Sequence, residues 1–218
     1  MNEVLKNVIE TTDFQSLFER KGYAYFTKGD YNLNIIGIRD LREGIVQRDN
    51  FNDALVCTYK INGKWYKDIW SISTDPGLKM LGAPMNSAGT AILVPGQYRG
   101  AYQIGLHKGQ YQALTQKKPV KVFRDRNKDN KLDFNSSTIQ EGMFGINIHG
   151  SMNANLSATM DPNKVNPTWE SSIVGSWSAG CQVFKNAKDY AEFMTLCRKA
   201  KDIYGNSFTY TLLTTDFD

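Results

Sequence analysis

A cysteine and a histidine in small-residue surroundings are the side chains of this sequence best suited to covalent chemistry. His149 follows the apolar run Gly-Ile-Asn-Ile and precedes Gly150, and Cys181 ends the segment Ser-Ala-Gly-Cys. A small-residue approach to a cysteine permits a tight turn, and N–H groups near the sulfur stabilise a thiolate and an oxyanion. A nearby imidazole would accept the thiol proton. From residue chemistry alone, a catalytic pair and a buried structural cysteine both stay open.

The two segments together resemble the catalytic signature of the L,D-transpeptidase (YkuD-like) family. Residues 145–150 (GINIHG) and 178–181 (SAGC) resemble its His-Gly after a hydrophobic strand, followed by Ser/Thr-His-Gly-Cys. Residues 91–98 (AILVPGQY) resemble its Thr-Pro-x-Gly-x-Tyr/Phe segment. The resemblance implies a mainly β fold, an L,D-transpeptidase-like β-sandwich with a cleft faced by Cys and His. It also implies action on peptidoglycan stem peptides through a thioester, which passes to an amine or to water.

The resemblance carries roles onto the matching positions. Cys181 would be the nucleophile and His149 the base, with the carbonyl of Gly150 orienting the imidazole as an acidic residue does in other triads. Backbone N–H groups near Gly180 and Cys181 would form the oxyanion hole. No cofactor is expected for this chemistry.

The residues around the cysteine match the family in part. Ser178 matches its Ser/Thr and would brace the loop, while Trp177 and Gln182 are the expected substrate contacts. A core position for Trp177 is equally compatible with the sequence. The family's His before Gly-Cys is replaced by Ala179, and the basic or amide residue two places after the Cys is replaced by Val183. These departures affect thiolate stability or substrate choice, but they leave the base in place.

The other histidine and cysteines have simpler expectations. His107 could replace the lost family histidine in space, but its position at the end of a predicted hairpin favours solvent exposure. Cys57 lies in an alternating strand and Cys197 on the apolar face of a helix, so both are expected to be core thiols. The polar stretch 151–172 is expected to be a long loop, either a substrate-binding flap or an insertion.

A second motif has the spacing of a calcium-binding loop. Oxygen side chains stand at positions 1, 3, 5 and 9 of an EF-hand-like pattern, namely Asp125, Asn127, Asp129 and Asp133. Such alternation lets a curled loop direct several oxygens at one hard cation. Position 12 is Ser136, so a bidentate ligand would come from elsewhere, for example Glu141. A structural Ca²⁺ near the approach to His149 and a solvated polar turn both stay open.

The segments that position these residues are mostly predicted strands. Residues 1–30 are expected to form a helical N-terminal extension, with Val4, Val8 and Ile9 on one face and Thr12 as a second cap. Residues 31–218 would then form the catalytic domain. Residues 54–61 and 64–72 flank Asn-Gly, which favours a type I′ hairpin.

Further elements follow along the chain. Segments 97–106 and 110–114 form a second predicted hairpin, and 33–38, 120–124 and 144–148 are further β-type segments. An apolar pattern predicts a C-terminal helix from Asn186 to a stop at Gly205, and residues 208–213 a closing strand.

Composition narrows the environment and the partners. The chain has 218 residues, of which 41% are hydrophobic, as expected of an ordinary globular protein. Its net charge of +4 favours an anionic polymer as a partner. No basic cluster with interleaved aromatics indicates nucleic acid, and no apolar run predicts membrane insertion. The first residues lack the apolar region of a secretory signal. We therefore expect synthesis in the cytoplasm and action at the cell wall, delivered for example inside a phage particle.

Three functions follow from these observations. The first is a cysteine-dependent enzyme on peptidoglycan peptides, hydrolytic (endopeptidase or carboxypeptidase) rather than cross-linking. The second is a structural or wall-binding component of a phage or phage-tail-like particle, contacting other virion or tail proteins, with weakened activity; Ala179 favours it and the retained His149 and Cys181 oppose it. The third is a cysteine hydrolase of another amide, since a catalytic pair does not define its substrate.

Overall fold

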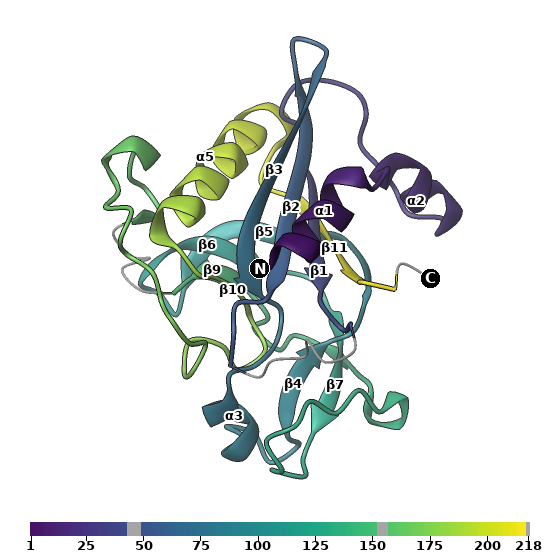
Figure 1. Ribbon diagram of the computed structural model, residues 1–218, viewed down its shortest axis with the longest axis vertical. Helices are drawn as coiled ribbons and strands as arrows, with labels where there is room; N and C mark the ends of the chain where they lie inside the picture. The colour runs from purple at the N-terminus through teal and green to yellow at the C-terminus, as the bar shows by residue number, and fades with distance from the viewer. Residues whose placement is uncertain (43–48, 152–156, 217–218) are drawn as a thin grey trace.

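Most of the described strands form one closed barrel, beside which lies a smaller sheet (Figure 1). The computed structural model describes residues 1–42, 49–151 and 157–216. Around the barrel the order is β1 (Asn34–Arg39), β11 (Phe208–Thr214), β5 (Gly96–His107), β6 (Tyr111–Gln116), β9 (Ile148–Gly150), β10 (Gln182–Phe184), β3 (Lys64–Ser73) and β2 (Asp53–Ile61). The smaller sheet has the order β4 (Thr90–Leu93), β7 (Val120–Asp125), β8 (Gln140–Gly142).

The mainly β class is confirmed, whereas the finer sandwich architecture is not. Strand β1 pairs with β2 on one side and with β11 on the other, which closes the larger sheet on itself. A closed sheet has no edge strand, and its inward side chains fill the interior. The transpeptidase-like sandwich therefore stays a prediction.

The predicted β2–β3 hairpin is confirmed and projects from the barrel (Figure 1). Its turn residues Asn62 and Gly63 have φ of 51° and 77°, as a type I′ turn requires. The second hairpin, β5–β6, also turns through residues with positive φ, Lys108 at 49° and Gly109 at 72°. Both predictions rested on local turn chemistry, which tertiary contacts did not override.

The N-terminal helices α1 (Glu3–Thr11) and α2 (Phe14–Arg20) pack on the outside of the barrel. Alternate residues of β1 explain this: Ile35 belongs to the interior core, whereas Ile36 and Ile38 contact the helices. The helical extension ends before residue 30. The buried face of α1 carries Leu5 and Ile9, whereas Val4, which was grouped with Ile9 on one face of the predicted helix, is 59% exposed.

The N-terminus of α2 is capped by a different residue from the one predicted. The side chain of Asp13, rather than Thr12, caps α2 by accepting from the Ser16 N–H. An aspartate carboxylate at this position also interacts favourably with the helix dipole.

The predicted C-terminal helix is present as α5 (Ala187–Tyr204), and it packs against the barrel. The Asn186 side chain caps it by accepting from the N–H groups of Lys188 and Asp189, and Gly205 ends it with φ of 84°. Phe193 and Met194 pack into the interior core. The short helix α3 (Leu78–Gly82) lies near the smaller sheet (Figure 1), and the 3₁₀ turns are η1 (Ser136–Thr138) and η2 (Pro162–Lys164).

Two irregular segments lie next to the predicted site. The predicted strand 144–148 is regular only from Ile148, because the Phe144 and Ile146 N–H groups donate to the Gln116 side chain, at 3.1 Å each. The predicted loop 151–172 contains η2 and ends near an isolated bridge between Glu170 and Asn186. Residues 152–156 of that loop lie outside the described residues.

Candidate active site

The predicted base lies on β9, and the predicted nucleophile immediately precedes the neighbouring parallel strand β10. In the β9–β10 pairing, Val183 stands opposite His149. Cys181 lies two residues before Val183, so its side chain is on the same face of the sheet as that of His149. Two segments that are 32 positions apart are thereby brought side by side.

The Cys181 thiol is held by backbone groups of the preceding segment. Its S–H donates to the Gly145 carbonyl, at 3.4 Å, and the Asn147 N–H points at its sulfur, at 3.5 Å. Burial raises the pKa of this thiol, while the Asn147 N–H and the charge of Lys108 act in the opposite direction. The resting group is a neutral thiol, which a base must deprotonate before attack.

His149 is oriented as such a base. The ring is 1% exposed, and its Nδ1 lies 2.9 Å from the Gly150 carbonyl and 3.2 Å from the Tyr111 hydroxyl. Because a carbonyl oxygen can only accept, the proton resides on Nδ1 and the lone pair on Nε2. Nε2 is buried and has no hydrogen-bond partner in the described chain. Burial and the neighbouring His107 lower the pKa of His149 to about 3, so the imidazole stays neutral.

His107 is buried against His149, which corrects the expectation that it is exposed at a hairpin end. The two rings stack with centroids 4.1 Å apart, and His107 is 6% exposed. Its Nδ1 lies 3.0 Å from the Asn147 amide nitrogen, which donates, so its own proton lies on Nε2. Burial lowers the pKa of His107 to about 4. Both His107 and Ala179 line the same cleft, so that cleft holds an imidazole although the motif position itself is Ala.

The turn before the cysteine is fixed by Ser178 and Gly180. The buried Ser178 Oγ donates to the Cys181 carbonyl, at 2.8 Å, and accepts from the Gly180 N–H, at 3.1 Å. Gly180 has φ of 121°, and a Cβ there would lie 2.3 Å from the Ala91 carbonyl oxygen, so no other residue fits. The bracing role expected of Ser178 matches these contacts. The Gly180 N–H is already used, so of the two N–H groups expected to form an oxyanion hole only that of Cys181 is left for this role.

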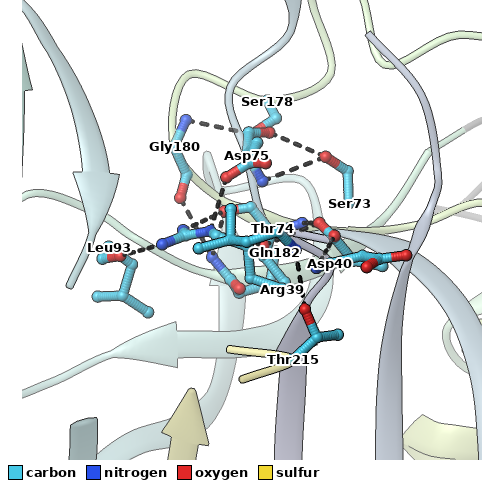
Figure 2. A network of polar contacts seen from close by, with 12 residues as sticks. Arg39, Asp40, Ser73, Thr74, Asp75, Leu93, Ser178, Gly180, Gln182 and Thr215 are labelled. Atoms are coloured by element: carbon cyan, nitrogen blue, oxygen red, sulfur yellow. Dashed lines mark hydrogen bonds and ion pairs between the residues drawn. The ribbon is translucent and has the colours of Figure 1, made fainter. Parts of the chain in front are cut away.

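A buried polar network supports this turn from the interior of the barrel (Figure 2). Gln182 is fully buried and donates to the carbonyls of Thr74 and Gly180, while its oxygen accepts from the Tyr210 hydroxyl at 2.8 Å. Gln182 therefore lies away from the cleft, and the expectation that it contacts substrate is corrected. Arg39 donates to the Thr74 carbonyl and pairs with Asp75, at 2.8 Å.

The second acid of that network is Asp53. Its carboxylate accepts from the N–H groups of Asp40 and Thr74, and burial together with Asp75 raises its pKa to about 7. Nothing in the sequence pattern singled out Arg39 or Asp53, since buried charges in strands have no local signature.

Cys181 opens into a cleft of about 650 Å³ between the barrel and the smaller sheet. The barrel contributes His107, the smaller sheet contributes residues of β4 and β7, and the segment after β8 and the turn that holds Cys181 complete the lining. Trp177 is 42% exposed at this cleft, which agrees with a substrate contact rather than a core position. The charged residues that line the cleft are Lys108 and Arg124, and both are cations.

The calcium-loop residues form turns in this structure. The side chains of Asn127, Asp129 and Asp133 each accept from the backbone N–H two residues ahead, and Asp125 accepts from the Asp133 N–H. Among the described residues no group of three or more His, Cys, Asp or Glu side chains is arranged to hold a metal ion. Calcium binding therefore stays a prediction. The two remaining thiols, Cys57 and Cys197, are free and buried.

Neither a scan against family models nor searches of curated proteins and of solved structures finds a match. No helix in the described ranges has the length and apolarity needed to cross a membrane. The functional assignment accordingly depends on the residues and on the geometry of their site.

Proposed function

We propose that this chain is a cysteine-dependent enzyme acting on the stem peptides of peptidoglycan, with an L,D-transpeptidase-like site. One observation carries the proposal. A buried neutral imidazole, with Nδ1 tied to the Gly150 carbonyl and Nε2 unpartnered in the described chain, lies on a strand paired to the one that follows Cys181, whose thiol lines an open cleft. A structural cysteine needs none of these features.

The reaction begins with a rotation of the thiol. In the resting state the S–H donates to Gly145, and no hydrogen bond joins it to His149 within the described residues. Catalytic contacts are often loose before substrate binds. The thiol turns to Nε2 and transfers its proton, and the thiolate attacks the substrate carbonyl carbon. The Cys181 N–H stabilises the oxyanion that forms.

Two proton transfers by His149 complete the cycle. The imidazolium returns its proton to the departing amine as the C–N bond breaks, which leaves a thioester on Cys181. Water then attacks this thioester and gives a proton to His149, and the thiol is regenerated with release of a carboxylic acid. We propose water as the acceptor, because the cationic cleft disfavours approach of a protonated diamino acid. Action at the wall from within a phage particle, beside virion or tail proteins, is part of this proposal.

The test is digestion of purified sacculi, with analysis of released muropeptides by mass spectrometry. Wild type is expected to release shortened or un-cross-linked stems, and Cys181→Ala and His149→Ala to release none. Rapid alkylation of Cys181 near neutral pH, slowed at least tenfold in His149→Ala, would establish the pair independently of substrate. A protein whose Cys181 reacts no faster than Cys57 or Cys197 would refute the enzyme.

The alternative is a structural or wall-binding virion component with weakened activity. The raised pKa of Cys181 and its hydrogen bond to Gly145 favour it, since the first keeps the thiol neutral and the second directs its proton to a carbonyl rather than to the base. Binding to sacculi without release of any muropeptide is the result expected of this alternative. Turnover of an unrelated amide, with no action on sacculi, would instead indicate another cysteine hydrolase.

A further inference from the structure

Arg124, on the wall of the cleft contributed by the smaller sheet, has an unusual environment for a cation. The residue is 7% exposed, and its Nε and Nη1 donate to the Gln140 side chain and the Gly89 carbonyl, at 2.9 and 3.1 Å. Its guanidinium lies over the Phe144 ring, 4.6 Å from the centroid. These contacts fix the plane of the group and leave Nη2 without a partner in the described chain.

No carboxylate compensates this charge. The ion pairs of the described residues do not include Arg124, and the residues that line the cleft contain neither Asp nor Glu. Burying a cation without an anionic partner is costly. The second cation, Lys108, projects into the same cleft from the β5–β6 turn. A guanidinium held by fixed contacts, in the lining of a cleft whose charged residues are all cations, is suited to an anionic ligand.

We infer that Arg124 binds a carboxylate of the peptide substrate, so that the cleft selects stem peptides with a free carboxylate over those in which it is amidated. The inference rests on the proposed function and adds its substrate class. The motif position after the cysteine that is basic or an amide in the resembling family is Val183 here, and Val183 is fully buried. In this cleft the anion-binding group is instead Arg124, which comes from β7 of the smaller sheet.

The test uses two synthetic stem peptides that differ only in a free or an amidated carboxylate. Binding is measured by calorimetry on Cys181→Ala, which cannot turn them over. The carboxylate peptide is expected to bind at least tenfold more tightly than the amide, since the net contribution of a hydrogen bond to a charged group corresponds to about tenfold or more in affinity. Arg124→Gln in the same background should abolish the preference by weakening only the carboxylate peptide. Arg124→Lys, which keeps the charge, should retain part of it, and Lys108→Gln most of it.

The outcomes separate the inference from the proposed function. Equal binding of the two peptides, or no binding of either, overturns the inference. A preference that survives in Arg124→Gln overturns it as well. A preference that depends on Arg124, in a protein whose wild type releases nothing from either peptide or from sacculi, upholds the inference and refutes the catalytic proposal. Alkylation of Cys181 by a neutral reagent should be unchanged in Arg124→Gln, which excludes a general collapse of the site.

Discussion

The stacked histidine pair makes the stability of this protein depend on pH in a way that one substitution can isolate. His149 has its pKa lowered from an unfolded value of about 6.5 to about 3, mainly by burial. Between these values the unfolded chain binds a proton that the folded chain does not, so stability falls as the pH falls below 6.5. From pH 8 to pH 5 the loss due to His149 alone is about 2 kcal/mol.

The substitution is His149→Asn, whose side-chain amide can still donate to the Gly150 carbonyl. The free energy of unfolding is measured by urea denaturation at pH 5, 6, 7 and 8 for both proteins. The variant is expected to be less stable at pH 8, because ring contacts with His107 are lost. The gap between the two proteins should narrow by about 2 kcal/mol at pH 5, since the variant has no imidazole at this position to protonate on unfolding.

Comparing two proteins is essential because other groups act in the opposite direction. Burial raises the pKa of Asp53 to about 7 and of Asp189 to about 6, so each adds stability as the pH falls. These contributions cancel in the difference between wild type and variant. The companion variant His107→Asn should show a similar narrowing, because the pKa of His107 is about 4. Stability curves that stay parallel from pH 8 to pH 5 would refute the buried neutral imidazole, and with it the base assigned to Cys181.

Three further predictions concern the turn before the cysteine and the calcium loop. Gly180→Ala should lower the rate of Cys181 alkylation at least tenfold and the free energy of unfolding by about 1–3 kcal/mol, because the added Cβ meets the Ala91 carbonyl at positive φ. Gly63→Ala, which has positive φ but open space around it, controls for the backbone strain, and equal effects at both sites would contradict the argument. Ser178→Ala should lower the free energy of unfolding in urea by about 1–3 kcal/mol, because it leaves the buried Gly180 N–H unpaired. The exposed control Ser172→Ala should change this free energy little, and an unchanged value for Ser178→Ala would show that the Oγ hydrogen bonds do not hold the turn. Millimolar Ca²⁺ should raise the melting temperature of wild type by several degrees, since a ligand that binds the folded state stabilises it. The melting temperature of the double variant Asp125→Asn/Asp129→Asn should not change, and an identical response of the two proteins would refute the calcium site.

Local chemistry in the sequence was sufficient for the elements that frame the site. The Asn62-Gly63 turn, the Asn186 cap and the Gly205 stop each depend on backbone angles or hydrogen bonds within a few residues, and each lies where it was predicted. The motif also predicted that His149 follows a β-type segment, and His149 lies in the short strand β9, while Cys181 immediately precedes β10. These features can be predicted from the sequence because they depend on neighbouring residues and not on contacts with distant segments.

Long-range pairing decided everything that depends on which strands are neighbours. The pairing of β1 with β11 closes the larger sheet into a barrel. The β9–β10 register brings the segment of Cys181 beside the strand of His149. The β5–β6 hairpin, paired to β9 through Leu114 and Ile148, buries a histidine that its turn position alone suggested would be exposed.

The same holds for the side chains that the sequence pattern missed or misplaced. Gln182 alternates into the barrel with the period of its strand, whereas Arg124 reaches the cleft from a different sheet. Sequence spacing determines which face of its own strand a residue occupies, because the backbone alternates with a period of two. What that face meets is determined only when the strands have closed around it, since pairing between distant segments follows the packing of the whole core.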